Sequence, residues 1–90
     1  MDAIQYTVDR EKIFWRQIAE ETVVLNVANG FSYTLDEMGT HIWKMTVDQK
    51  DLDYIVSKIT EEYEVDAVTC QNDVKAFLKH LEHGGFFKKN

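Results

Sequence analysis

The sequence contains no proline, only one cysteine, Cys70, and no long apolar run. Without proline, an internal repeat or a low-complexity segment, nothing in the chain marks a linker between domains. A lone cysteine cannot form an internal disulfide, which favours a reducing compartment such as the cytoplasm. No stretch approaches the roughly 18 apolar residues of a membrane-spanning helix, and residues 1–10 lack the apolar segment of a secretion signal. We therefore expect a cytoplasmic protein.

Positive charge is also scarce. Ten Lys and Arg residues oppose sixteen Asp and Glu residues, so the net charge is −6. This balance argues against non-specific binding to nucleic acid or to an anionic membrane. The charge is uneven, because residues 70–90 carry four lysines against two acidic residues. The C-terminal part of the chain is therefore mildly basic.

The length of 90 residues leaves room for one hydrophobic core and little capacity to enclose a deep pocket. The hydrophobic fraction of 44% is that of a folded domain. We predict a single domain spanning residues 1–90, with an ordered core over residues 13–87. A module that binds a partner at its surface is favoured over an enzyme.

Extended segments occupy the first part of the chain. Residues 13–19 and 22–27 are rich in β-branched and aromatic residues, which predicts two strands joined by a tight turn. Asn29-Gly30 indicates a hairpin, because both residues tolerate positive φ, and the alternation over residues 31–35 predicts a third strand. The three strands should form an antiparallel meander.

Beyond this region the apolar spacing changes to the helical period. Asp36 and Asp51 are candidate N-caps of two helices, and a third helix is predicted from Ala67 to His83, with Gly84-Gly85 ending it. The apolar face of the third helix comprises Val74, Phe77, Leu78 and Leu81. With no strand–helix–strand crossover, we predict an α+β fold: a three-stranded antiparallel sheet followed by three helices, all on one face of the sheet.

The third predicted strand carries no charge between Gly30 and Leu35. Natural sheet edges are usually short, charged or covered, because an open edge pairs readily with another chain. An uncharged edge strand beside a helix can accept an extended peptide as an additional strand.

Two sets of residues resemble the PqqD-like family. The first set is Val23-Val24-Leu25-Asn26, then Gly30-Phe31-Ser32-Tyr33-Thr34-Leu35-Asp36, then Gly39-Thr40-His41-Ile42-Trp43. The second set is Leu52-x-x-Ile55-Val56, then Glu62-Tyr63-Glu64-Val65-Asp66, then Asp73-Val74-x-x-Phe77-Leu78-x-x-Leu81 and Gly85-Phe86. The resemblance covers residues 13–87. One departure is the loop Val47-Asp48-Gln49-Lys50, which lacks the glycine that the family often has after an Asp.

The resemblance implies a RiPP precursor-peptide recognition element with a winged helix-turn-helix fold. Such a protein binds the leader segment of a ribosomally made peptide and delivers it to a modifying enzyme or leader protease, in lasso-peptide or PQQ-type biosynthesis, and is not itself an enzyme. In the family, the leader adds as a strand to the third strand and lies against the third helix. Carried over to this sequence, the implied peptide-binding residues are Phe31, Ser32, Tyr33, Thr34, Val74, Lys75, Leu78 and Lys79.

Several alternatives remain open from the residues alone. Strand alternation does not decide whether Phe31 and Tyr33 face the core or the leader. Lys75 and Lys79 could attract leader carboxylates or could be ordinary solvated surface. A winged helix can also bind nucleic acid, although the acidic balance counts against it. An edge strand can swap or pair between copies, which leaves a homodimer open.

No catalytic or metal-binding pattern stands out. His80 and His83 lie three residues apart, but a closed zinc site needs four ligands and the chain adds only Cys70. No phosphate-binding glycine loop and no Ser-His-Asp arrangement is present. We therefore predict no catalytic residue, no cofactor and no metal. The predicted partners are a precursor peptide and its processing enzyme, with no nucleic acid and no membrane.

Overall fold

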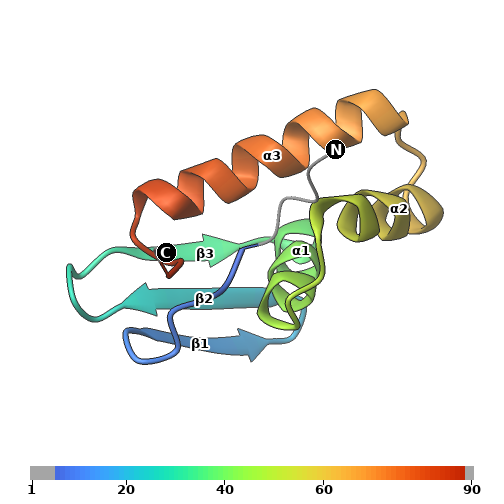
Figure 1. The fold of residues 1–90 in the computed structure, drawn as a ribbon. Helices are drawn as coiled ribbons and strands as arrows, with labels where there is room; N and C mark the ends of the chain where they lie inside the picture. Colours follow the sequence, from blue (N-terminus) through green and yellow to red (C-terminus); the bar gives the residue numbers. More distant parts are fainter. Residues whose placement is uncertain (1–5, 89–90) are drawn as a thin grey trace.

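The computed structural model describes residues 6–88. Three strands come first and three helices follow (Figure 1). Their bounds are β1 Ile13–Ile18, β2 Glu21–Asn26, β3 Ser32–Leu35, α1 Glu37–Val47, α2 Leu52–Glu62 and α3 Ala67–His83. The sheet has the order β1-β2-β3, and both pairings are antiparallel. The predicted order and topology are confirmed, and β3 is an edge strand.

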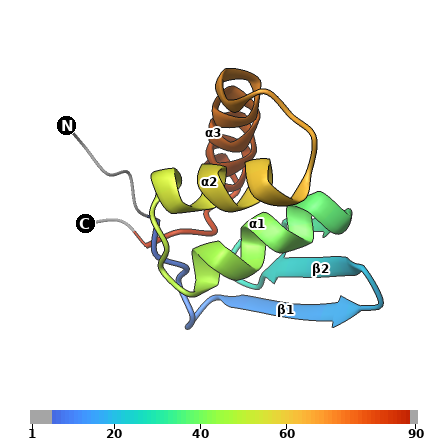
Figure 2. The ribbon, with the colours of Figure 1, turned by 90° about the vertical axis from the view of Figure 1, so that its right-hand side faces the viewer.

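The two faces of the sheet differ in burial. Thr22, Val24 and Asn26 of β2 are buried, while the residues between them are exposed. Figure 2 shows α1 lying between the sheet and α2. The opposite face is left uncovered and carries exposed apolar side chains, among them Phe14 and Val23. The sheet therefore buries one face against the helices, as the alternation along β2 indicates.

The core centres on Trp43 and Phe86, which are fully buried and meet edge to face at 6.4 Å between ring centroids. Trp43, which belongs to the Ile42-Trp43 pair of the family resemblance, is thus a core residue. A buried hydrogen bond of 2.9 Å between the hydroxyls of Thr22 and Thr40 joins β2 to α1. Apolar burial and this polar link together hold α1 against the sheet.

Aspartate side chains begin all three helices. Asp36 accepts a hydrogen bond from the backbone N–H of Gly39, and Asp51 does the same for Tyr54. Both caps were predicted. Asp66 fills the same role for α3. In each case the carboxylate satisfies a helix N–H that has no partner within the helix and complements the positive end of the helix dipole.

The turns differ from the predictions in detail. Gly30 has a φ of 81°, but Asn29 does not adopt positive φ. Its side chain instead accepts a hydrogen bond from Phe31 N–H and donates one to the Gly84 carbonyl, which ties the hairpin to the end of α3. Ala19, predicted in the first strand, lies in the β1–β2 turn with a φ of 56°.

The loop after α1 is the place where the sequence departs from the PqqD-like pattern. Gln49 has a φ of 63° there, directly after the C-cap residue Asp48. A left-handed residue at this position normally favours glycine. The backbone therefore keeps the glycine-like conformation although the side chain is a glutamine.

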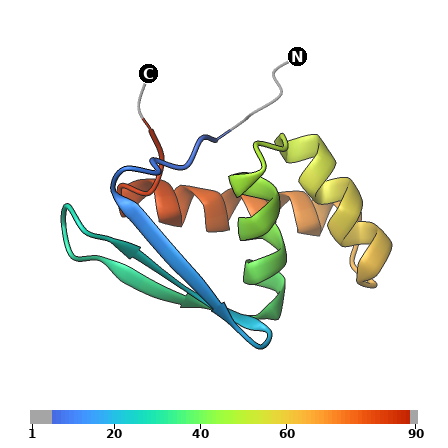
Figure 3. The same cartoon turned by 90° about the horizontal axis from the view of Figure 1, so that it is seen from below.

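The N-terminal segment is packed further upstream than the predicted start at Ile13. Val8 is buried and forms an isolated β-bridge with Phe87, and Asp9 N–H donates to the Phe86 carbonyl. Figure 3 shows the segment before β1 beside the segment that follows α3. Residues 1–5 lie outside the described residues. Phe86 and Phe87 are buried, so the residues after α3 fold back onto the core. Within residues 6–88, no helix is long and apolar enough to cross a membrane.

Candidate functional site

The free side of β3 exposes backbone hydrogen-bonding groups. Asn26 N–H donates to the Phe31 carbonyl across the hairpin. Pairs along an antiparallel ladder alternate between hydrogen-bonded and non-hydrogen-bonded. Counting along the register from the hydrogen-bonded pair of Asn26 and Phe31, the pair of Val24 and Tyr33 is hydrogen-bonded and the pair of Val23 and Thr34 is not. The N–H and C=O groups of Thr34, and by the same alternation those of Ser32, therefore point away from β2 to the open edge.

The side chains of β3 divide between the two sides of the sheet. Leu35 is buried, and Tyr33 is half-buried against α3, with its ring 4.6 Å from that of His80 and 5.4 Å from that of Phe86. Ser32 and Thr34 are exposed. Phe31 precedes the strand and is 50% exposed. Of the two aromatic residues left open above, Tyr33 forms part of the packed wall beside α3, whereas Phe31 is accessible.

A recess of about 310 Å³ separates the edge of β3 from α3. Figure 1 shows α3 running beside β3. The lining residues come from β3, from the start of α1 and from one side of α3: Tyr33, Thr34, Leu35, Asp36, Phe77 and His80. The exposed backbone of Thr34 therefore lies at the wall of a hollow whose far side is helical.

A second recess, of about 210 Å³, lies between the helices, with no lining residue from β3, and adjoins the first at the two residues that line both, Asp36 and Phe77. Its remaining lining residues are largely apolar: Met38, Gly39, Ile42, Ile59, Val65, Cys70, Asp73 and Val74. We call the two recesses together the β3–α3 groove. An extended chain on the edge of β3 would have its alternate side chains directed into this groove.

Two of the predicted helix residues belong to the core. Val74 and Leu78 are each 1% exposed. Val74 contributes only to the floor of the groove, and Leu78 does not line it. Both side chains fill the interior between α3 and the rest of the molecule, and their contact with a peptide stays a prediction.

The two predicted lysines lie on the other side of α3. Lys75 and Lys79 are exposed, and neither lines the groove. Each lies two residues from Phe77, which places it about 200° around the helix. Their position is away from the groove, and the prediction that these lysines face the peptide stays a prediction.

The α3 residues that do line the groove above its floor are Asp73, Phe77 and His80. Their spacing of four and three residues places them on one helical stripe beside the buried one. The sequence showed this spacing, but Phe77 was assigned to the core face and His80 was considered only as a metal ligand. The spacing of these residues could be read from the sequence, but the sequence did not indicate that this side of α3 faces the groove.

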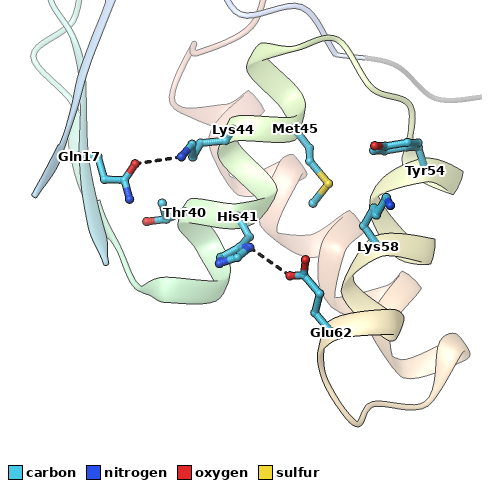
Figure 4. A pocket seen from close by; sticks show the side chains of 8 residues that line it. All are labelled: Gln17, Thr40, His41, Lys44, Met45, Tyr54, Lys58 and Glu62. Carbon is cyan, nitrogen blue, oxygen red and sulfur yellow. Dashed lines mark hydrogen bonds and ion pairs between the residues drawn. The ribbon is translucent and has the colours of Figure 1, made fainter. Parts of the chain in front are cut away.

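A separate surface recess of about 310 Å³ lies between α1 and α2 (Figure 4). His41 Nδ1 lies 3.3 Å from Glu62 Oε1, and Lys44 Nζ donates to Gln17 Oε1 at 3.2 Å. Both His41 and Glu62 are about half exposed, and such surface pairs contribute little to stability. Among residues 6–88, no three His, Cys, Asp or Glu side chains are grouped to hold a metal ion.

The fold and the groove together define a class of protein: a small α+β module in which, within residues 6–88, one strand edge beside a helix is unpaired. The family model described as Coenzyme PQQ synthesis protein D (PqqD) matches residues 21–86. The chain belongs to this family. No curated protein matches the sequence.

Two solved structures are similar to this chain. The first is described as "TbiB1 in Complex with the TbiA(beta) Leader Peptide"; it is 27% identical, with a TM-score of 0.86, over 93% of this chain and 96% of the other. The second, "Lasso peptide synthetase B1 complexed with the leader peptide", is 22% identical, with a TM-score of 0.79, over 87% of this chain and 92% of the other. The second likeness establishes the fold alone.

Proposed function

We propose that this protein binds the leader segment of a ribosomally synthesised precursor peptide and delivers it to a modifying enzyme or leader protease. The observation that carries the proposal is the open edge of β3, where the backbone groups of Ser32 and Thr34 point away from β2 and Thr34 lines a recess whose far side is α3. Membership of the PqqD family supports it. The similar structures, both described as leader-peptide complexes, support it further.

Strand addition explains how so small a protein binds a peptide without a pocket. Backbone hydrogen bonds to β3 supply affinity that depends little on the peptide's sequence, and apolar side chains at alternate positions fill the groove and supply specificity. Because ordering a flexible leader costs conformational entropy, the affinity should depend on a few apolar anchors. We assign the contacts to Phe31, Ser32, Tyr33 and Thr34 on the strand side, and to Phe77 and His80 on α3.

In this proposal the protein is an adaptor without a catalytic step of its own. The buried free thiol of Cys70 suits a reducing cytoplasm. The sequence resemblance implies two biosynthetic classes for the peptide, lasso-peptide maturation and PQQ-type biosynthesis, and membership of the PqqD family is compatible with both. The processing enzyme would then act on a peptide held in extended form.

The direct test is amide-resolved NMR during titration of ¹⁵N-labelled protein with a synthetic candidate leader. We expect the largest shift changes over residues 30–35 and along the side of α3 that carries Phe77 and His80. The recess of Figure 4 between α1 and α2 provides the internal control, and the amides of His41 and Lys58 should move little. Shifts confined to that recess would contradict the assigned site.

A further inference from the structure

The charge of the β3–α3 groove is negative. The residues that line its two recesses include two carboxylates, Asp36 and Asp73, and no lysine or arginine. The sequence had suggested the opposite, because Lys75 and Lys79 make the C-terminal part of the chain mildly basic. A peptide in the groove meets the acidic residues, since the lysines lie on the other side of α3.

Asp73 is the carboxylate best placed to act on a peptide. It lies one helical turn before Phe77 on the groove-lining stripe of α3, is exposed, and forms no ion pair with any residue in the range 6–88. Its charge reaches the floor of the recess: burial first, and the negative charge of Asp73 second, raise the pKa of the Cys70 thiol. An unpaired carboxylate at the rim of an apolar recess favours a cation beside an apolar group.

Asp36 adds to the same field from the other wall. One of its oxygens accepts the Gly39 N–H at 2.8 Å, and the positive end of α1 offsets part of its charge. The surrounding surface is nonetheless acidic. Burial first, and then the charges of Glu37, Glu62, Asp36 and Glu20, raise the pKa of Tyr63. Asp73 is therefore the main determinant, and Asp36 is a secondary one.

We propose that the β3–α3 groove selects peptide segments in which an apolar anchor is accompanied, two positions away, by a lysine or arginine that pairs with Asp73. The spacing follows from strand geometry, because residues two apart on an added strand point to the same side, about 6.6–6.8 Å apart. The apolar side chain enters the recess under Phe77 while the cation remains at its rim. This specificity rests on the leader-binding function proposed above.

The occupant is thus an extended, basic-apolar peptide segment, and an acidic segment is disfavoured. Charge complementarity singles out this occupant over a second copy of the chain, whose net charge is also −6. The groove would repel such a copy unless a basic segment were presented to it.

The test uses a display library of random 15-residue peptides, selected on the immobilised full chain. The selection is repeated on Asp73→Asn and on Asp36→Asn, in which asparagine retains the capping ability of the aspartate. The matched control is Glu82→Gln, which removes one exposed charge from α3 at a position about 140° from Phe77. We expect wild type and the Glu82 variant to enrich Lys or Arg two positions from an apolar residue, and Asp73→Asn to lose that enrichment.

A double-mutant cycle then measures the pairing itself. For one selected peptide, replacing its basic residue by glutamine should weaken binding to wild type by about two- to fivefold at low salt and leave binding to Asp73→Asn nearly unchanged. Equal loss on both proteins, or enriched peptides without basic residues, would overturn the proposed selectivity while leaving peptide binding intact. If no peptide is enriched in a way that depends on the β3 edge, the proposed function itself fails.

Discussion

Replacing Thr34 by proline removes one donor from the open edge of β3 while leaving the ladder to β2 intact. Thr34 pairs with Val23 in a non-hydrogen-bonded position, so its N–H points to the edge and not to β2. Proline is tolerated on an edge strand when the missing N–H faces solvent. The substitution therefore separates peptide binding from folding.

The expected loss follows from one hydrogen bond and from the bulk of the ring. A backbone hydrogen bond contributes about 0.5–1.5 kcal/mol net, and the ring also keeps the added strand from close approach. We expect a total of about 1–2 kcal/mol, which corresponds to a Kd raised by about five- to thirtyfold. The free energy of unfolding should change by no more than about 1 kcal/mol, because the core and the β2–β3 ladder are retained.

Fluorescence anisotropy with a labelled leader or selected peptide measures the Kd, and urea unfolding measures the stability. The matched control is Thr34→Val, which removes the hydroxyl but keeps the N–H, and should bind the peptide within about twofold of wild type. Unchanged affinity in Thr34→Pro, with normal stability, would refute strand addition to β3. Equal loss in both variants would assign the effect to the side chain instead.

Three further predictions follow from the same structure. Phe77→Ala should raise the Kd for the peptide about tenfold, measured by anisotropy, because the ring lines both recesses of the groove. The same substitution should lower the free energy of unfolding in urea by only about 1–2 kcal/mol, because the ring is half-buried. Full affinity would show that Phe77 is not part of the site. Joint replacement of Lys75 and Lys79 by glutamate should change the Kd by less than about twofold at about 150 mM salt, since both lie on the far side of α3. A large loss of affinity would support the prediction that these two lysines face the peptide. Gln49→Gly should have a free energy of unfolding about 0.5–1 kcal/mol above that of Gln49→Ala, because glycine adopts the φ of 63° without strain, and equal urea midpoints for the two variants would contradict this.

Local chemistry along the chain was enough to predict the elements and their order. Asp36 and Asp51 were identified as caps because a carboxylate before a helical period satisfies free backbone N–H groups. The edge position of β3 follows from the meander, because consecutive hairpins place the first and third strands at the edges. These features depend on neighbours in sequence, so the sequence alone determines them.

Turn details were less accessible, because they depend on contacts that are remote in sequence. Asn29-Gly30 indicated a hairpin because both residues tolerate positive φ, but only Gly30 takes that conformation, while the Asn29 side chain donates to the Gly84 carbonyl at the end of α3. The pairing of Val8 with Phe87 likewise joins the two ends of the described chain. No local pattern in either segment indicates its partner.

The groove residues of α3 could be predicted in part from the sequence and in part only from the tertiary structure. Helical periodicity by itself places Lys75 and Lys79 on one side, Phe77 on the other, and Asp73 in line with Phe77. Periodicity does not say which stripe borders β3, because that direction depends on how α3 packs over the sheet. Burial of Leu78 and contact between His80 and Tyr33 decide it. The sequence therefore determined that an uncharged strand edge lies beside a helix, and only the tertiary structure decided that Phe77 and His80 are the residues of this helix that line the recess beside the edge.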